Sequence, residues 1–216
     1  MAAREVETVL KQANPNPVAI MGSDGTNLQL MKVNSSGELV LGDNETSVQA
    51  ATELTRPTDT NAYAIADAVA NSTTAGSVVP LQFTAARSAG GSGRVTGAQL
   101  IVDSATAFGA IRLHLFNTTP FAAAGFQADN SALALTYTAL KTGSAGANPN
   151  YIGFIDFTTF NAQSASAVSN GICDLTELNF DCAAGSQVIF GLLEARAVFT
   201  PANGGKFDVS LQVIQD

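Results

Sequence analysis

The amino-acid sequence predicts an all-β protein, a jelly-roll-like antiparallel β-sandwich that follows a small N-terminal β-meander arm. Apolar and polar residues alternate with a period of two in several segments, and loops rich in Gly, Ala, Ser and Asn separate those segments. Heptads and long amphipathic helices are missing, which disfavours helical and βαβ folds. The 216 residues suffice for one large β domain with a short appendage. We expect the arm at residues 1–53 and the sandwich at residues 54–216.

The arm contains three short segments that are typical of a β-meander, at residues 18–21, 28–33 and 38–41. Turn-forming residues at 23–25 (Ser-Asp-Gly) and 34–37 (Asn-Ser-Ser-Gly) separate them. Strands this short bury little surface by themselves, so we expect them to dock on a partner. The apolar residues that would form this partner interface are Met21, Leu28, Leu30, Val33, Leu39 and Leu41.

The chain is expected to bend at Arg56-Pro57. Pro57 restricts its own φ and pushes Arg56 toward an extended conformation, and residues 58–61 (Thr-Asp-Thr-Asn) supply turn-forming side chains. A strand therefore ends here and the main β region begins.

The main β region contains at least six segments that favour strands. Pro80 indicates that the first is an edge strand, because proline cannot donate a ladder hydrogen bond. Gly97 marks a candidate β-bulge. Residues 172–180 also fit a helical turn, so strand and helix both remain open there. The six predicted strands cover 79–83, 95–103, 111–116, 151–157, 188–199 and 207–214.

The composition indicates that the protein associates with partners. Charged residues make up 13% of the chain, about half of the ~25% that is usual for soluble domains. The predicted loops at 121–130, 142–150 and 161–170 hold almost no charge. A lightly charged surface has little electrostatic protection against association, so we expect a homo-oligomer whose uncharged loops meet neighbouring subunits.

The charge pattern argues against nucleic acid and membrane as partners. Ten basic and eighteen acidic residues give a net charge of −8, and no Lys/Arg cluster is present. Binding to nucleic acid through counterion release needs several basic groups on one surface. No apolar run approaches the ~18 residues of a membrane span, and residues 1–7 lack the apolar core of a signal peptide. We expect synthesis without an export signal of the chain's own.

Few residues suggest catalysis or metal binding, and we expect no enzyme activity, no metal and no cofactor. His114 is the only histidine, and no GxSxG motif accompanies it, so a catalytic triad lacks support; we expect a surface or interface side chain. Cys173 and Cys182 would form a disulfide only across a local chain reversal, and two small, at least half-buried thiols are the simpler interpretation. The glycine-rich run 90–94 leads into a strand, so a structural turn is favoured over a phosphate loop.

Two carboxylate patterns leave alternatives open. The acidic turns at 23–24 and 43–45 carry oxygen ligands but match no EF-hand spacing, so solvated turns are favoured over calcium sites. Asp156 and Asp174 would form a glycoside hydrolase pair only if they meet in a cleft.

Several blocks of sequence, in order, resemble a group of small structural proteins of tailed bacteriophages and prophages. The opening block at 54–69 is similar to the pattern Arg-Pro-x-Asp-Thr-x-Ala-Tyr-Ala-x-x-Asp-x-Val, which includes Tyr63 and Asp67. The resemblance covers about residues 54–160 well and the rest loosely. The later similar blocks are 91–101, 112–116 with Pro120, 128–132 and 151–157.

This resemblance implies a virion component, among which are capsid decoration (cement) proteins with jelly-roll cores. We therefore expect a non-enzymatic decoration protein that is made in the bacterial host cytoplasm and sits on the outer capsid surface, with the major capsid protein as its partner. A trimer is favoured over a dimer, because trimers fit the local threefold positions of a capsid lattice. The alternative is a receptor- or glycan-binding module of a tail or head fibre, which clustered exposed aromatic residues or a pocket would favour.

Overall fold

The computed structural model divides the chain into two compact units, Met1–Asn44 and Glu45–Asp216. The structure describes residues 19–23, 28–31, 46–103, 109–119, 127–133, 135, 151–162 and 168–216, with the backbone alone at 19–23, 28–31, 162 and 168–176. The boundary precedes the one predicted after residue 53. The physical reason is β3 (Thr46–Thr55), which is hydrogen-bonded into the second unit along its whole length.

The first unit contains a two-stranded antiparallel hairpin. Strand β1 (Ala19–Ser23) pairs with β2 (Leu28–Met31), and Ala19 lies opposite Met31. The first two strands of the predicted meander are therefore confirmed. The third, predicted at 38–41, lies outside the described residues.

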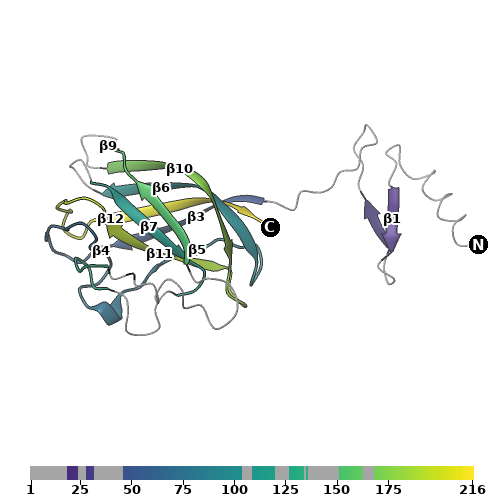
Figure 1. Cartoon of the computed structure of the whole chain (residues 1–216), viewed down its shortest axis with the longest axis horizontal. Coiled ribbons are helices and arrows are strands. Elements are labelled where there is room, and N and C mark those ends of the chain that lie inside the picture. The colour runs from purple at the N-terminus through teal and green to yellow at the C-terminus, as the bar shows by residue number, and fades with distance from the viewer. Residues whose placement is uncertain are drawn as a thin grey trace, which may run out of the picture. The chain divides into compact units, whose positions relative to one another are not determined.

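The second unit is built from two antiparallel sheets, drawn in Figure 1. In the first sheet β3 is followed by β12 (Lys206–Gln215), β6 (Ser92–Asp103), β10 (Val168–Asp181) and β9 (Phe160–Ala162). In the second sheet β11 (Val188–Ala195) is followed by β7 (Ile111–Phe116) and β8 (Tyr151–Phe157). The short strands β4 (Ala68–Val69) and β5 (Leu81–Thr84) both pair with β11, with a 3-10 turn, Ala75–Ser77, between them.

The strand pairing is that of a jelly roll, as predicted. The eight main strands in chain order are β3, β5, β6, β7, β8, β10, β11 and β12. The first pairs with the last, β5 pairs with β11, β6 with β10, and β7 with β8. This pattern corresponds to one long hairpin folded over into two sheets, which the β12–β6 and β11–β7 pairs complete.

Alternating side chains of both sheets fill the core. In β12 the predicted inward row of Phe207, Val209, Leu211 and Val213 is fully buried. The opposite sheet contributes the inward residues of β7, at 111, 113 and 115, which are also fully buried. The period-two pattern in the sequence therefore reports the inward faces correctly.

A bulge lies in β6 next to the predicted position. The ladders to both β12 and β10 shift register between Val95 and Gly97, so Thr96 has no opposite residue. Because the extra residue changes the phase of the strand, Val95 and Ala98 both face the core. Residues 172–180 lie within β10, so the strand interpretation is confirmed and the helical turn is wrong.

The structure also differs from the predicted layout in two segments. The uncharged stretch 161–170 was expected to be a loop, but its two ends form the hairpin between β9 and β10. A strand was expected to end at Arg56-Pro57, and β3 ends immediately before it at Thr55, but its start at Thr46 was not predicted, because most of its side chains are small or polar and only Ala50 and Leu54 are buried. Pro80 immediately precedes β5, which lies at the edge of its sheet as expected.

Candidate functional site

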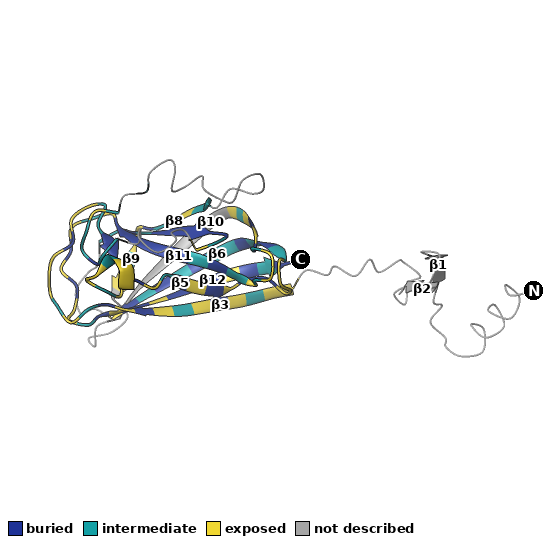
Figure 2. Cartoon of the chain, turned by 90° about the horizontal axis from the view of Figure 1, so that it is seen from below, coloured by how far each residue is buried: buried dark blue, intermediate teal, exposed yellow. Residues whose placement is uncertain are grey.

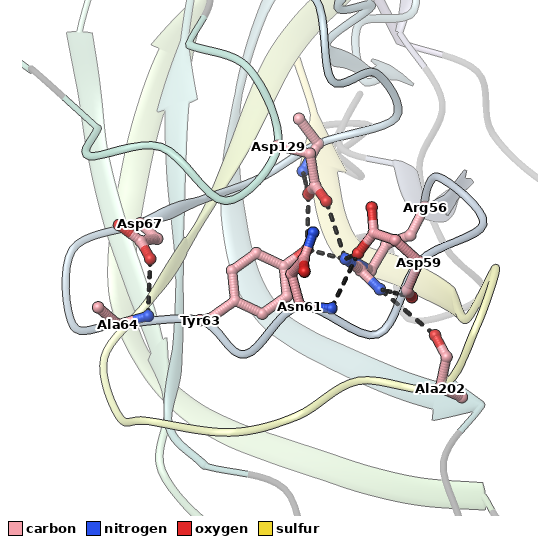
Figure 3. Close-up of polar contacts among 9 residues, drawn as sticks. Arg56, Asp59, Asn61, Tyr63, Ala64, Asp67, Asp129 and Ala202 are labelled. Carbon is pink, nitrogen blue, oxygen red and sulfur yellow. Dashed lines mark hydrogen bonds and ion pairs between the residues drawn. The ribbon is translucent and has the colours of Figure 1, made fainter.

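The bend after β3 forms a buried polar cluster around Arg56, which we call the Arg56 cluster (Arg56, Asp59, Tyr63, Asp129 and Ala202). Figure 3 shows these residues converging from three parts of the chain: the bend itself, the segment at 127–133 and the connection before β12, where Ala202 contributes its carbonyl oxygen. The extended conformation that Pro57 favours carries the chain out of the sheet. The backbone N–H of Arg56 still donates to Gly205 at 3.0 Å.

The guanidinium of Arg56 donates to every other member of the cluster. Nη2 lies 2.9 Å from Asp129 Oδ2 and 3.1 Å from Asp59 Oδ1, and Nη1 lies 3.3 Å from the carbonyl oxygens of Asp59 and Ala202. Nε donates to the Tyr63 hydroxyl. The hydroxyl in turn donates to Asp129 Oδ1 at 2.5 Å, which also accepts from the backbone N–H of Ala70 at 2.8 Å.

Burial makes this cluster energetically important. The side chains of Arg56 and Asp129 are both 0% exposed. Burial, together with the hydrogen bond to Asp129, raises the pKa of Tyr63 far above its ordinary value, so Tyr63 stays protonated and keeps donating. A buried charge is tolerated when its hydrogen-bonding capacity is met, and each of the three guanidinium nitrogens has a partner here.

The rest of the opening block is held by backbone contacts. Tyr63 forms an isolated bridge with Phe199, and their ring centroids lie 4.8 Å apart. Asp67 Oδ2 accepts from the backbone N–H of Ala64 at 2.6 Å and closes the turn in which Ala66 adopts a φ of 73°. Tyr63 and Asp67, the two residues that stand out in the resemblance, therefore have structural roles in this fold.

A second polar cluster lies on the outer face of the second sheet, around His114. Residues 112, 114 and 116 of β7 point away from the core, because 111, 113 and 115 point into it. His114 Nε2 lies 2.8 Å from Glu194 Oε2 on β11, and Nδ1 lies 2.9 Å from the Tyr151 hydroxyl on β8. Arg196 donates to the other oxygen of Glu194 at 3.1 Å.

The contacts determine the tautomer of His114. A carboxylate only accepts, so Nε2 carries the proton that Glu194 accepts, and Nδ1 accepts from Tyr151. Burial lowers the pKa of His114 despite the opposing effect of Glu194, which keeps the ring neutral at neutral pH. The structure places His114 at 5% exposure, so the expected surface position is wrong. Both ring nitrogens are occupied, which suits a structural role.

Asp156 is also engaged. Arg112 binds it with two hydrogen bonds, Nε to Oδ1 at 2.6 Å and Nη2 to Oδ2 at 2.8 Å, and its guanidinium lies 3.9 Å from the ring centroid of Phe154. The hydrogen bonds from Arg112 lower the pKa of Asp156. Asp174 belongs to β10 in the other sheet, and its side chain lies outside the described residues. Nothing described brings the two carboxylates into one cleft.

The predicted partner-interface residues fall in the first unit. Met21 lies in β1, and Leu28 and Leu30 lie in β2, where only the backbone is described. Val33, Leu39 and Leu41 lie outside the described residues. The interface therefore stays a prediction.

The remaining sequence candidates are structural where they are described. Cys182 is a free, buried thiol whose pKa burial raises to about 11. The run 90–94 forms a turn into β6, with Gly90 at a φ of 73°. Within the described ranges no three His, Cys, Asp or Glu side chains gather as metal ligands do. Both acidic turns considered for calcium have their carboxylates outside those ranges. None of the described helices has the length and apolar character to span a membrane.

A groove of about 450 Å³ lies at the seam between the two sheets. Its walls come from the second half of β3, at 52–55, and from 79–82 at the start of β5. Val79 on this wall is 53% exposed. The groove was not predicted, because the extent of β3, which forms one of its walls, could not be recognised in the sequence.

No protein-family model matches the chain, and no curated protein matches it significantly. Among solved structures, the chain is similar to PRD1 vertex protein P5 at 14% identity and a TM-score of 0.27, over 76% of this chain and 95% of that one. A likeness at this TM-score does not define a shared fold, so the jelly-roll architecture rests on the strand pairing itself.

Proposed function

We propose that this chain is a non-enzymatic structural protein of a tailed-phage virion, a decoration (cement) protein on the outer capsid surface. Its partners are the major capsid protein and further copies of itself. The proposal combines the sequence blocks that resemble phage structural proteins with the jelly-roll unit into which those blocks fold.

This proposal is supported most strongly by the structural role of the opening block. Arg56 and Tyr63 belong to the part of the chain with the strongest resemblance, and both form internal hydrogen bonds with Asp129. The single histidine likewise uses both ring nitrogens on Tyr151 and Glu194. A general base needs a nitrogen within reach of substrate, whereas these side chains make internal hydrogen bonds that hold the fold together.

The mechanism of a decoration protein is additional buried area across capsomer boundaries. Internal DNA pressure pushes the capsomers apart, and each contact that spans a boundary raises the free energy needed to separate them. We assign attachment to the first unit, whose hairpin carries predicted interface residues such as Met21, Leu28 and Leu30. Full burial of one such side chain contributes ~1.5–3 kcal/mol, so a few of them suffice for stable attachment.

The alternative, a receptor- or glycan-binding module of a fibre, has one feature in its favour, the groove at the sheet seam. The exposed aromatic residues that would support stacking on sugars do not gather in the described part of the chain. The exposed large apolar side chains there are Ile65, Val79, Phe154 and Val198, of which one is aromatic.

A reconstruction of the virion distinguishes the two functions. The decoration role predicts density for the jelly-roll unit at repeated positions on the outer capsid surface, between capsomers. Density confined to tail or head fibres would support the binding module instead. The absence of the protein from purified virions would contradict both.

A further inference from the structure

The free edge of β3 differs from the sheet edges formed by β5, β8 and β9. Strand β5 has only four residues and follows Pro80, and β9 has three. Strand β8 carries an irregular register and Gly153 at a φ of 154°. Short length, proline and irregularity are the devices that keep sheet edges from pairing with other chains.

Strand β3 has none of these devices. Its ten residues pair with β12 without any register shift, and they include no proline, lysine or arginine and one acidic residue, Glu53. Within the described residues, no backbone group outside β12 hydrogen-bonds to it, and it is the terminal strand of its sheet. In Figure 2 its exposed residues run along the margin of the sandwich. The alternate N–H and C=O groups on this edge can accept another strand.

We propose that β3 pairs with β3 of a second copy of this chain, antiparallel and about a two-fold axis at Ala51, which gives a dimer in place of the trimer that the sequence favoured. An isologous pair of this kind joins the two first sheets into one continuous sheet. A continuous sheet must keep the inward faces of both copies on one side, so even-numbered residues lie opposite even-numbered ones and odd opposite odd.

One such register makes the strand self-complementary. With Ala51 opposite its own copy, Leu54 lies opposite Val48 on the core side, where Leu54 is buried and Val48 half-buried. On the outer side Glu53 lies opposite Gln49. No charge faces a like charge, and the small Ala51 side chains meet on the axis. Shifting the register by two residues either way places Leu54 against the polar Thr46 or against Ala50, whose side chain is smaller than that of Val48.

Hydrogen bonds to neighbouring residues already hold the Glu53 side chain on the outer face of β3. Its Oε1 already accepts from Lys206 Nζ at 2.9 Å and from Thr55 at 3.4 Å. The second carboxylate oxygen is then available to accept from the amide of Gln49 across the new ladder. The occupant of the β3 edge is therefore a second β3, chosen by side-chain complementarity as well as by backbone pairing.

Disulfide trapping in the full chain tests the pairing and its register together. Ala51→Cys should give a disulfide-linked dimer under mild oxidation, because the two residues 51 face each other. Ser47→Cys alone should give none, because each residue 47 lies opposite residue 55 of the other copy and the two residues 47 are eight positions apart along the ladder. Combining Ser47→Cys with Thr55→Cys should restore the dimer. The native cysteines are the same in all three variants.

Sedimentation of the native chain and of Ala51→Lys completes the test. The native chain should contain a two-fold dimer, and Ala51→Lys should halve its mass while leaving the circular dichroism spectrum unchanged, because the side chain is exposed and the charges meet on the axis. A native monomer at micromolar concentration would overturn the proposal. So would equal trapping of Ala51→Cys and Ser47→Cys, or an unchanged mass for Ala51→Lys.

Discussion

At the scale of single residues, Asp129 is the carboxylate on which the Arg56 cluster depends. It is fully buried and accepts from Arg56, Tyr63 and the backbone of Ala70. Asp129→Ala would leave a buried guanidinium without its main counter-charge, so we expect a loss of about 3–5 kcal/mol in the free energy of unfolding.

The matched control is Asp59→Ala, the other carboxylate on Arg56. The Asp59 side chain is 24% exposed, and its removal leaves the Asp129 pair intact. We expect a loss of about 1 kcal/mol. Urea denaturation of both variants measures the difference, and equal losses would show that the cluster does not depend on the buried pair.

His114→Ala should reduce stability without removing function. The side chain is buried and bonded through both nitrogens, so we expect a loss of about 1–3 kcal/mol, since Glu194 keeps only Arg196 among its described side-chain partners. Binding of this variant to capsids that lack the protein, measured below the melting temperature of the variant, should be unchanged. Lost binding with an intact fold would give His114 a direct role.

The pKa of His114 also predicts a pH dependence. Burial lowers this pKa in the folded state, so the unfolded chain takes up the proton first as the pH falls. The contribution of neutral His114 to the free energy of unfolding is complete above about pH 6.5, its pKa in the unfolded chain. This contribution is lost as the pH falls through the pKa of His114 in the folded chain. Between pH 7.5 and 5 the native chain should therefore lose more thermal stability than His114→Asn. Parallel losses would contradict this assignment.

At the scale of elements, the entry into β6 requires glycine at residue 93. A Cβ there would lie 2.4 Å from the Ile214 carbonyl oxygen and 2.8 Å from the Phe180 ring. Gly93→Ala should cost about 1–3 kcal/mol or more, because a backbone atom must move. Gly76→Ala is the control, since nothing lies within 4 Å of its Cβ. Thermal melting should separate the two variants clearly.

Elements whose inward face is strongly apolar could be predicted from the sequence. The limits of β7 and β8 agree with the predicted 111–116 and 151–157, because alternation reports burial on one face. The extent of β3 could not be found in this way, because an edge strand with a mostly exposed pattern needs few apolar residues. The β9–β10 hairpin was missed for a related reason, since small polar residues at 161–170 suit loops and edge strands equally.

The candidate sites could be predicted only in part. Arg56 and Tyr63 stand out in the opening block, but their partner Asp129 is 66 residues from Tyr63, in a segment without periodicity. Only the fold brings them together. His114 was predicted to be structural, but its burial was not predicted. Its neighbours on the outer face, Tyr151 and Glu194, come from adjacent strands, and the alternation within β7 alone does not indicate them.

At the scale of the whole molecule, the two units predict different outcomes for two truncations. Residues 45–216 should fold alone, because this unit contains the complete jelly roll. Deleting 1–53 should be far more damaging, since it removes most of β3 and uncovers the β12 edge. Unfolding curves for the two fragments test this, and equal stability would mean that β3 contributes nothing to the sandwich.

Attachment to the capsid through the first unit is tested most directly by co-sedimentation of the protein with particles that lack it. The full chain should bind these particles and raise the temperature at which they release DNA. Residues 45–216 should fold but bind far more weakly. Unchanged binding by residues 45–216 would place the attachment surface on the jelly roll, and no binding by the full chain would contradict the decoration role.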